Sequence, residues 1–172
     1  MTAQREPDEM VELLDVHGRR FDDNDVWLLA PSAEREAFAS KVFAGDIAEC
    51  WIFVAAIEPG GYGRWRPPGG GVTSTHRWSF VAHHGVTEEP VIRHGCDVRC
   101  CANPHHLVDG TQAQNICDTV ERGAWRSIAL PIWPARSFRL REAALAGDRE
   151  RVNELCARPE QLRLFAGGEV TT

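Results

Sequence analysis

The chain has 172 residues, of which 43% are hydrophobic and 26% charged, a composition typical of a folded globular protein and not of a disordered one. This length suits one main domain with extensions. No apolar run approaches the roughly 20 residues that span a bilayer, and the acidic start MTAQREPDEMVELL lacks the apolar segment of a signal peptide, so we expect a soluble cytoplasmic protein with no membrane partner.

The net charge of -6 argues against a nucleic-acid partner but does not exclude one, because the charge is unevenly distributed. Residues 1–49 hold 12 acidic and 5 basic residues, whereas residues 50–134 hold seven of each. A local positive field therefore remains available in the middle of the chain. We expect an acidic N-terminal extension with a short helix (1–47), a core (48–125), and a proline linker followed by an arginine-bearing helical tail (126–172).

The first strong helix pattern covers residues 32–45. Ser32 is a suitable N-cap, Glu34 and Glu36 lie in the first turn, and Gly45 is a suitable stop, which predicts about three turns. From Cys50 onward the pattern changes to short β-rich runs broken by glycine and proline. These runs predict strands at CWIFVAAI (50–57) and YGRWRP (62–67), a strand or helix at THRWSFVAHHG (75–85), and a buried strand at VIRHGC (91–96).

The chain after this last strand predicts a loop and then a helix. The strand places His94 near its end, CANPHH (101–106) forms the loop, and the segment 107–123 is predicted helical, capped by Asp109 or Thr111. Asn115 would then lie about one turn into this helix. In the tail, alternating arginine and glutamate favours solvated helix faces, with DNA-backbone contacts as the alternative.

The six cysteines favour a metal site over disulfides, because they are interleaved with histidines and no signal peptide precedes them. Cys96, Cys101 and His106 follow one another at intervals of five residues around an Asn-Pro turn, and thiolate and imidazole are the ligands that tetrahedral zinc prefers. Cys50 is our choice for the fourth ligand. Spacing alone does not distinguish Cys101 from Cys100, or His106 from His105, as a zinc ligand. Cys100, His105 and Cys117 therefore remain alternative ligands.

The same stretch carries residues suited to phosphodiester hydrolysis. A histidine at the end of a strand, such as His94, can act as a general base near neutral pH. A hard divalent ion takes oxygen ligands and keeps several waters, so the Asn115 side chain can serve as its protein ligand. Arg64 and Arg77 are candidates to hold phosphate, with exposed surface arginines as the alternative for each. His76, with His83 and His84, is expected to be an ordinary surface or core residue.

The stretch HGCDVRCCANPHHLVDGTQAQN, from residue 94 to 115, resembles the HNH motif of the His-Me finger (ββα-metal) nucleases through His94, Asn103 and Asn115. Its spacing is similar to that of the zinc-containing His-Cys box homing endonucleases. The resemblance covers roughly residues 48–125 and is absent from the first 45. It implies an α+β protein with a ββα-metal core and a structural zinc, flanked by helical N- and C-terminal extensions. It also favours Cys101 and His106 as ligands beside Cys50 and Cys96.

The resemblance further implies a DNA endonuclease. His94 would be the general base, Asn115 the ligand of Mg²⁺ or Mn²⁺, and Asn103 a residue that pins the loop and orients the base. Many relatives place a metal-binding acid or histidine directly before the base, where this chain has Arg93. The alternatives are a zinc-stabilised DNA-binding module without cleavage and a structural zinc domain that binds protein through its acidic third. A homodimer is compatible with the endonuclease.

Overall fold

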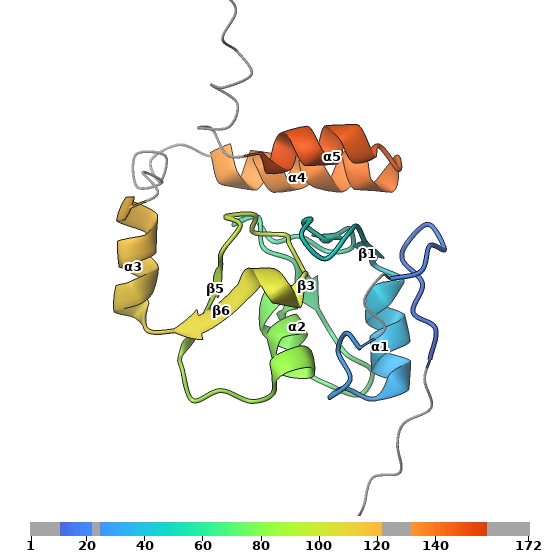
Figure 1. Ribbon diagram of the computed structural model, residues 1–172, viewed down its shortest axis with the longest axis horizontal. Helices are drawn as coiled ribbons and strands as arrows, with labels where there is room; N and C mark the ends of the chain where they lie inside the picture. The colour runs from blue at the N-terminus through green and yellow to red at the C-terminus, as the bar shows by residue number, and fades with distance from the viewer. Residues whose placement is uncertain (1–10, 22–24, 122–131, 158–172) are drawn as a thin grey trace, which may run out of the picture.

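A computed structural model describes residues 11–21, 25–121 and 132–157, with the side chains of 132 and 133 left undescribed. The fold is mixed α+β, with small two-stranded antiparallel sheets between helices (Figure 1). Strand β1 (Val42–Phe43) pairs with β2 (Ile52–Phe53), β3 (Arg64–Trp65) with β4 (Thr73–Ser74), and β5 (Val91–His94) with β6 (Leu107–Gly110). The helices are α1 (Ser32–Ala39), α2 (Thr75–His84), the 3-10 turn η1 (Pro104–His106), α3 (Gln112–Glu121), α4 (Ile132–Leu145) and α5 (Arg149–Cys156).

Helix α1 is shorter than the sequence predicts. It ends at Ala39, and Pro31, not Ser32, is its N-cap residue. The predicted continuation to Gly45 is wrong because Val42 and Phe43 leave the helix and pair with β2, where both are fully buried. Burial of these two large apolar side chains outweighs the local preference for helix.

The β5–β6 hairpin positions the residues of the predicted site. His94, the last residue of β5, pairs with Leu107, the first residue of β6. The connection between them holds Cys96, Cys101 and η1. The segment 107–110 is therefore a strand, and the predicted helix begins only at Gln112, where the Thr111 hydroxyl accepts a hydrogen bond from the Gln114 amide (3.2 Å).

Of the three hydrophobic clusters among the described residues, β2 contributes to the two larger ones. Successive strand residues point to opposite faces, so Phe53 packs in the first cluster and Ile52 in the second. The first cluster is aromatic and joins Trp27 and Phe38 to Trp51. The clusters cross both predicted domain boundaries, since residues from the N-terminal third, the middle and the tail pack together.

Helix α2 is tied to the loop that carries the predicted ligands. The Trp27 indole N–H donates to the Ser79 hydroxyl (2.7 Å), which in turn donates to the Ala102 carbonyl (2.6 Å). Ser79 and Ala102 are fully buried. Buried hydrogen bonds of this kind are costly to break, so they fix the position of the loop relative to α2.

The tail packs as a pair of helices over the sheets, as the orange and red ribbons of Figure 1 show. The prediction of solvated faces holds for Arg139 and Arg151, which are exposed, and is wrong for Arg136, Arg141 and Arg149, which are half-buried. The Arg136 guanidinium donates to the carbonyls of Leu155 (2.6 Å) and Cys156 (2.9 Å), and Arg141 donates to the Val54 carbonyl (2.6 Å). These donors satisfy carbonyl groups at helix and strand ends, which anchors the tail to the core.

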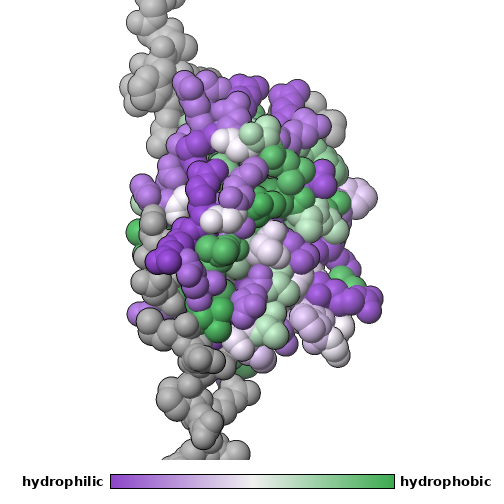
Figure 2. Space-filling model, turned by 90° about the vertical axis from the view of Figure 1, so that its right-hand side faces the viewer, coloured by the Kyte–Doolittle hydropathy of each residue, from purple (hydrophilic) through white to green (hydrophobic). Residues whose placement is uncertain are grey.

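On the face seen in Figure 2, hydrophilic side chains surround several hydrophobic patches. Within the described ranges, the helices are too short or too polar to cross a bilayer.

Candidate metal centre and adjoining pocket

The four predicted zinc ligands lie together. Cys50 lies two residues before the start of β2, Cys96 and Cys101 lie in the loop after β5, and His106 ends η1. Their ligand atoms are all within 4.8 Å of one another. His106 Nδ1 is 3.7 Å from Cys50 Sγ and 3.7 Å from Cys101 Sγ. These residues form a Cys₃His group that can hold a metal ion such as zinc.

The geometry of the group fits a tetrahedral ion. Zinc bonds of about 2.3 Å to sulfur and about 2.0 Å to nitrogen, at the tetrahedral angle, imply a sulfur-to-nitrogen distance of about 3.5 Å. Both separations of 3.7 Å in the structure are close to this value. The other ring nitrogen of His106, Nε2, is 3.2 Å from the Ala48 carbonyl oxygen, which can only accept a hydrogen bond. The proton therefore lies on Nε2, and the Nδ1 lone pair faces the sulfur atoms.

Burial adds a reason for a cation. Cys101 is fully buried, and this burial raises the pKa of its thiol well above the ordinary value. A thiolate at this position needs a neighbouring positive charge. The backbone N–H of Asn103 also donates to Cys101 Sγ (3.5 Å), a contact that would stabilise a thiolate.

The structure separates each ligand from its sequence neighbour. Cys100 points into the second core cluster, and burial raises the pKa of its thiol to about 12. His105 packs edge-on against the Trp51 ring, with centroids 6.4 Å apart. Cys117 is exposed on α3. Within the described residues, none of these three side chains belongs to the Cys₃His group.

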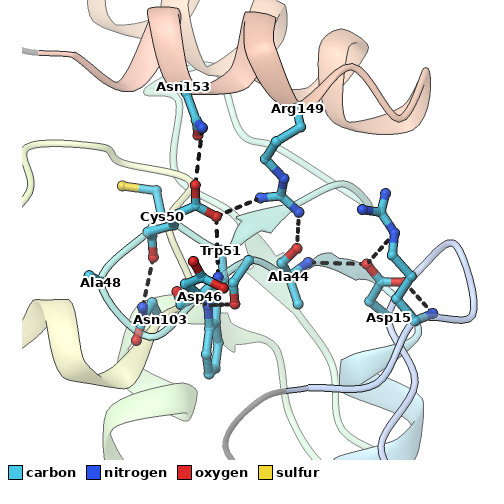
Figure 3. Close-up of polar contacts among 12 residues, drawn as sticks. Asp15, Ala44, Asp46, Ala48, Cys50, Trp51, Asn103, Arg149 and Asn153 are labelled. Atoms are coloured by element: carbon cyan, nitrogen blue, oxygen red, sulfur yellow. Dashed lines mark hydrogen bonds and ion pairs between the residues drawn. The ribbon is translucent and has the colours of Figure 1, made fainter.

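Asn103 ties the segment before Cys50 to the loop that carries the other candidate ligands, and Figure 3 shows it beside Cys50. It is fully buried, and its Nδ2 donates to the carbonyls of Ile47 and Glu49, each at 2.8 Å. Its Oδ1 accepts from the His105 amide (3.0 Å). The side chain thus links the segment before Cys50 to η1 and supports the metal ligands from behind. Its predicted role as the residue that pins the loop agrees with these contacts.

A pocket of about 500 Å³ is lined by β5, and it adjoins the metal centre through His94, which contacts the Cys101 carbonyl. His94, Asn115 and Arg64 all line it, although they come from β5, α3 and β3. Arg77 does not. It is exposed on α2, and its guanidinium donates to the Pro90 carbonyl (3.3 Å). Of the two arginines predicted to hold phosphate, the fold brings only Arg64 to the pocket.

Hydrogen bonding fixes the tautomer of His94. Its Nε2 is 3.2 Å from the Cys101 carbonyl oxygen, an acceptor, so the proton lies on Nε2 and the lone pair on Nδ1. Burial, the largest influence, lowers the pKa of His94 below its ordinary value. The ring is therefore neutral near pH 7 and can accept a proton. Because Cys101 provides both a thiol and this carbonyl, the metal centre and the His94 ring are fixed by the same residue.

The pocket also holds residues that sequence reasoning set aside or missed. The His76 ring lies 4.9 Å from the His94 ring between centroids, and Tyr62 lies 5.4 Å from His76. Arg93 contacts Asp118 of α3 through Nη1 (2.5 Å) and the Asp109 carbonyl through Nη2 (3.1 Å). The position of Arg93 directly before His94 drew attention in the sequence, but its partner Asp118 carries no local pattern. For His76 the only sequence signal was its place beside Arg77.

The fold and site define a mixed α+β protein with a candidate Cys₃His metal centre beside a histidine-bearing pocket. No family model and no solved structure matches the chain. The chain is similar to Protein 2.8 of Escherichia phage T7, with 37% identity over 75 residues, which is 43% of this chain and 51% of the phage protein. The similarity thus spans about half of the phage protein's length.

Proposed function

We propose that this protein is a metal-dependent DNA endonuclease of the HNH type. In this proposal, Cys50, Cys96, Cys101 and His106 hold a structural zinc. His94 is the general base, and Asn115 is the protein ligand of a catalytic Mg²⁺ or Mn²⁺. The strand, strand, helix order of β5, β6 and α3 around the metal centre agrees with a ββα-metal core.

The observation that carries the proposal is the pairing of His94 with Asn115 in one pocket. His94 is neutral, its ring is held by the Cys101 carbonyl, and its basic nitrogen is Nδ1. Asn115 reaches the same pocket from α3, and the amide oxygen of its side chain suits a hard divalent ion. A base and an oxygen ligand brought together by separate elements are what hydrolysis of a phosphodiester by water requires.

Each residue then has a defined task. A divalent ion, when bound, would neutralise charge on the scissile phosphate and on the leaving oxygen. His94 takes the proton of the attacking water at Nδ1 and remains fixed by its Nε2–H bond. Arg64 faces the same pocket and can hold a phosphate oxygen through its guanidinium, which is also paired with Glu58 at 3.2 Å.

The direct test is plasmid cleavage by the purified full chain with Mg²⁺, Mn²⁺ or EDTA. Metal-dependent cleavage that disappears in His94→Ala, with zinc content and melting temperature unchanged, supports the proposal. The matched control is His84→Ala, because His84 lies outside this pocket and its Nε2 contacts the Pro104 carbonyl (3.1 Å). A His94→Ala variant that cuts at the parental rate removes His94 from the mechanism.

One contact favours a second function, a zinc-stabilised DNA-binding module without cleavage. Arg93 stands where many HNH enzymes carry a metal ligand, and its guanidinium binds Asp118 inside the pocket. Retention of a DNA duplex without cleavage under any metal would select this function. If the protein does cleave, nicked product indicates a monomer acting on one strand, and linear product indicates a homodimer.

A further inference from the structure

His76 is a half-buried histidine with no assigned task. It is the second residue of α2, and it lines the pocket beside His94. Among the described residues, no group hydrogen-bonds to its Nδ1, which is sealed from solvent. Orphaned buried polar atoms are uncommon, and one beside a candidate active site calls for an explanation.

The two ring nitrogens of His76 differ in access. Nδ1 is sealed and without a hydrogen-bond partner. Among the described residues Nε2 has no hydrogen-bond partner either, yet it is not one of the sealed unpartnered atoms, so Nε2 keeps accessible surface and is the nitrogen open to the pocket. A proton on Nδ1 would be a buried N–H that no ligand could reach. A proton on Nε2 can be satisfied by whatever enters the pocket, and this tautomer therefore costs less.

The ring is also held neutral. Burial, followed by the charges of His94 and Arg77, lowers the pKa of His76 to about 3. A neutral ring next to His94 can donate a hydrogen bond without placing a second positive charge beside the base. The surrounding contacts hold it in place, since the Tyr62 and His94 rings lie 5.4 Å and 4.9 Å from it.

The β3–β4 hairpin explains how His76 works with Arg64. Arg64 pairs with Ser74, and α2 begins at the next residue, Thr75. The β3–β4 hairpin and the start of α2 therefore bring the Arg64 guanidinium, which can bind phosphate, and the His76 ring, which can donate a hydrogen bond, to the same pocket. The His94 and Asn115 side chains approach from β5 and α3.

We propose that His76 is a further catalytic residue, whose Nε2–H donates to a non-bridging oxygen of the scissile phosphodiester while His94 activates the water. This inference rests on the proposed function, because it assigns a substrate contact in the same pocket. It adds a histidine that acts as a neutral hydrogen-bond donor and not as a base.

The test compares three substitutions of His76 in the full chain: His76→Gln, His76→Asn and His76→Ala. The glutamine amide can place its nitrogen near the position of Nε2, and the asparagine amide near that of Nδ1. We expect the alanine and asparagine variants to lose about a hundredfold in kcat with KM changed less than threefold, because removing one transition-state donor has about this effect. The glutamine variant should stay within tenfold of the parent.

Zinc content and melting temperature are measured for every variant, and His84→Ala serves as the control histidine. If the alanine variant does not fold, the near-isosteric glutamine and asparagine variants decide. A purely structural role would lower the stability of both amide variants alike and would not separate their kcat values. Equal kcat values for these two variants overturn the inference.

Failure of this inference is distinguishable from failure of the proposed function. A parent that cleaves, with His76→Ala within threefold of it, overturns the inference and leaves the nuclease standing. A parent that binds a duplex without cutting it overturns the proposed cleavage, and with it the catalytic role of His76. A parent that neither binds nor cuts DNA overturns the proposed function and this contact with it.

Discussion

Replacing Asn103 by alanine should test how the metal centre is held together. The side chain makes three hydrogen bonds of 2.8, 2.8 and 3.0 Å and is fully buried. Each contributes about 1 kcal/mol net, and its loss leaves the carbonyls of Ile47 and Glu49 without this donor. We therefore expect the free energy of unfolding to fall by about 3 kcal/mol, a large part of the about 5 to 15 kcal/mol typical of a domain.

The assay is urea unfolding with excess zinc, read by tryptophan fluorescence, since Trp51 follows the segment that Asn103 holds. A second readout is the rate at which a chelator removes zinc, which should rise because Cys50 is no longer fixed relative to Cys101. Asn103→Asp keeps the volume and the acceptor for His105 but loses both donors. It should be at least as destabilising as the alanine variant.

The matched control is Asn153→Ala. Asn153 is exposed, and its Nδ2 donates to the Glu49 carboxylate (3.0 Å), as Figure 3 shows. An exposed bond of this kind contributes little, so we expect a change below about 0.5 kcal/mol. An Asn103→Ala variant that loses less than 1 kcal/mol, or no more than Asn153→Ala, would refute the reasoning.

Three further predictions concern the ligands, the α3 contact and pH. Cys101→Ser should lose zinc and lower the melting temperature by at least about 10 °C, because structural zinc stabilises the fold directly, whereas Cys117→Ser at an exposed thiol should change neither; unchanged melting of the first variant contradicts the metal assignment. Arg93→Gln breaks the contact to Asp118, so hydrogen exchange should speed up in α3 while α2 stays protected; equal exchange would mean that the pair does not hold α3. Since the pKa of His76 is lowered from 6.5 to about 3, the unfolded state alone binds this proton as pH falls below 6.5. The free energy of unfolding of the parent, measured in urea, should therefore fall by about 1.5 kcal/mol more than that of His76→Gln between pH 6.5 and 5. The same pH dependence of stability in both proteins would contradict this prediction.

Much of the metal centre could be predicted from local sequence. Cysteine and histidine around an Asn-Pro turn indicated the ligand set, and the strand ending at His94 and the Thr111 cap follow from short-range preferences. The choice between Cys100 and Cys101 could not be made this way. Adjacent residues in an extended segment point to opposite sides, and the bridge between Ile52 and Cys101 decides which side faces the metal group.

Tertiary packing also decided which side chains line the pocket. His76 and Arg77 are neighbours on α2 and point about 100° apart around the helix, so one lines the pocket and the other lies on the surface. No sequence pattern specified this orientation, because the packing of α2 against the sheets sets it.

Tertiary contacts likewise decided the environment of several arginines in the tail. Alternating arginine and glutamate predicts solvated faces, yet Arg149 lies 3.9 Å above the Phe43 ring and Arg141 donates to β2's neighbouring carbonyls. The sequence by itself determined which residue types can bind a metal or move a proton, since that chemistry belongs to single side chains and close neighbours. Only the tertiary structure decided which of them meet, because their partners lie tens of residues away and burial selects among equivalent candidates.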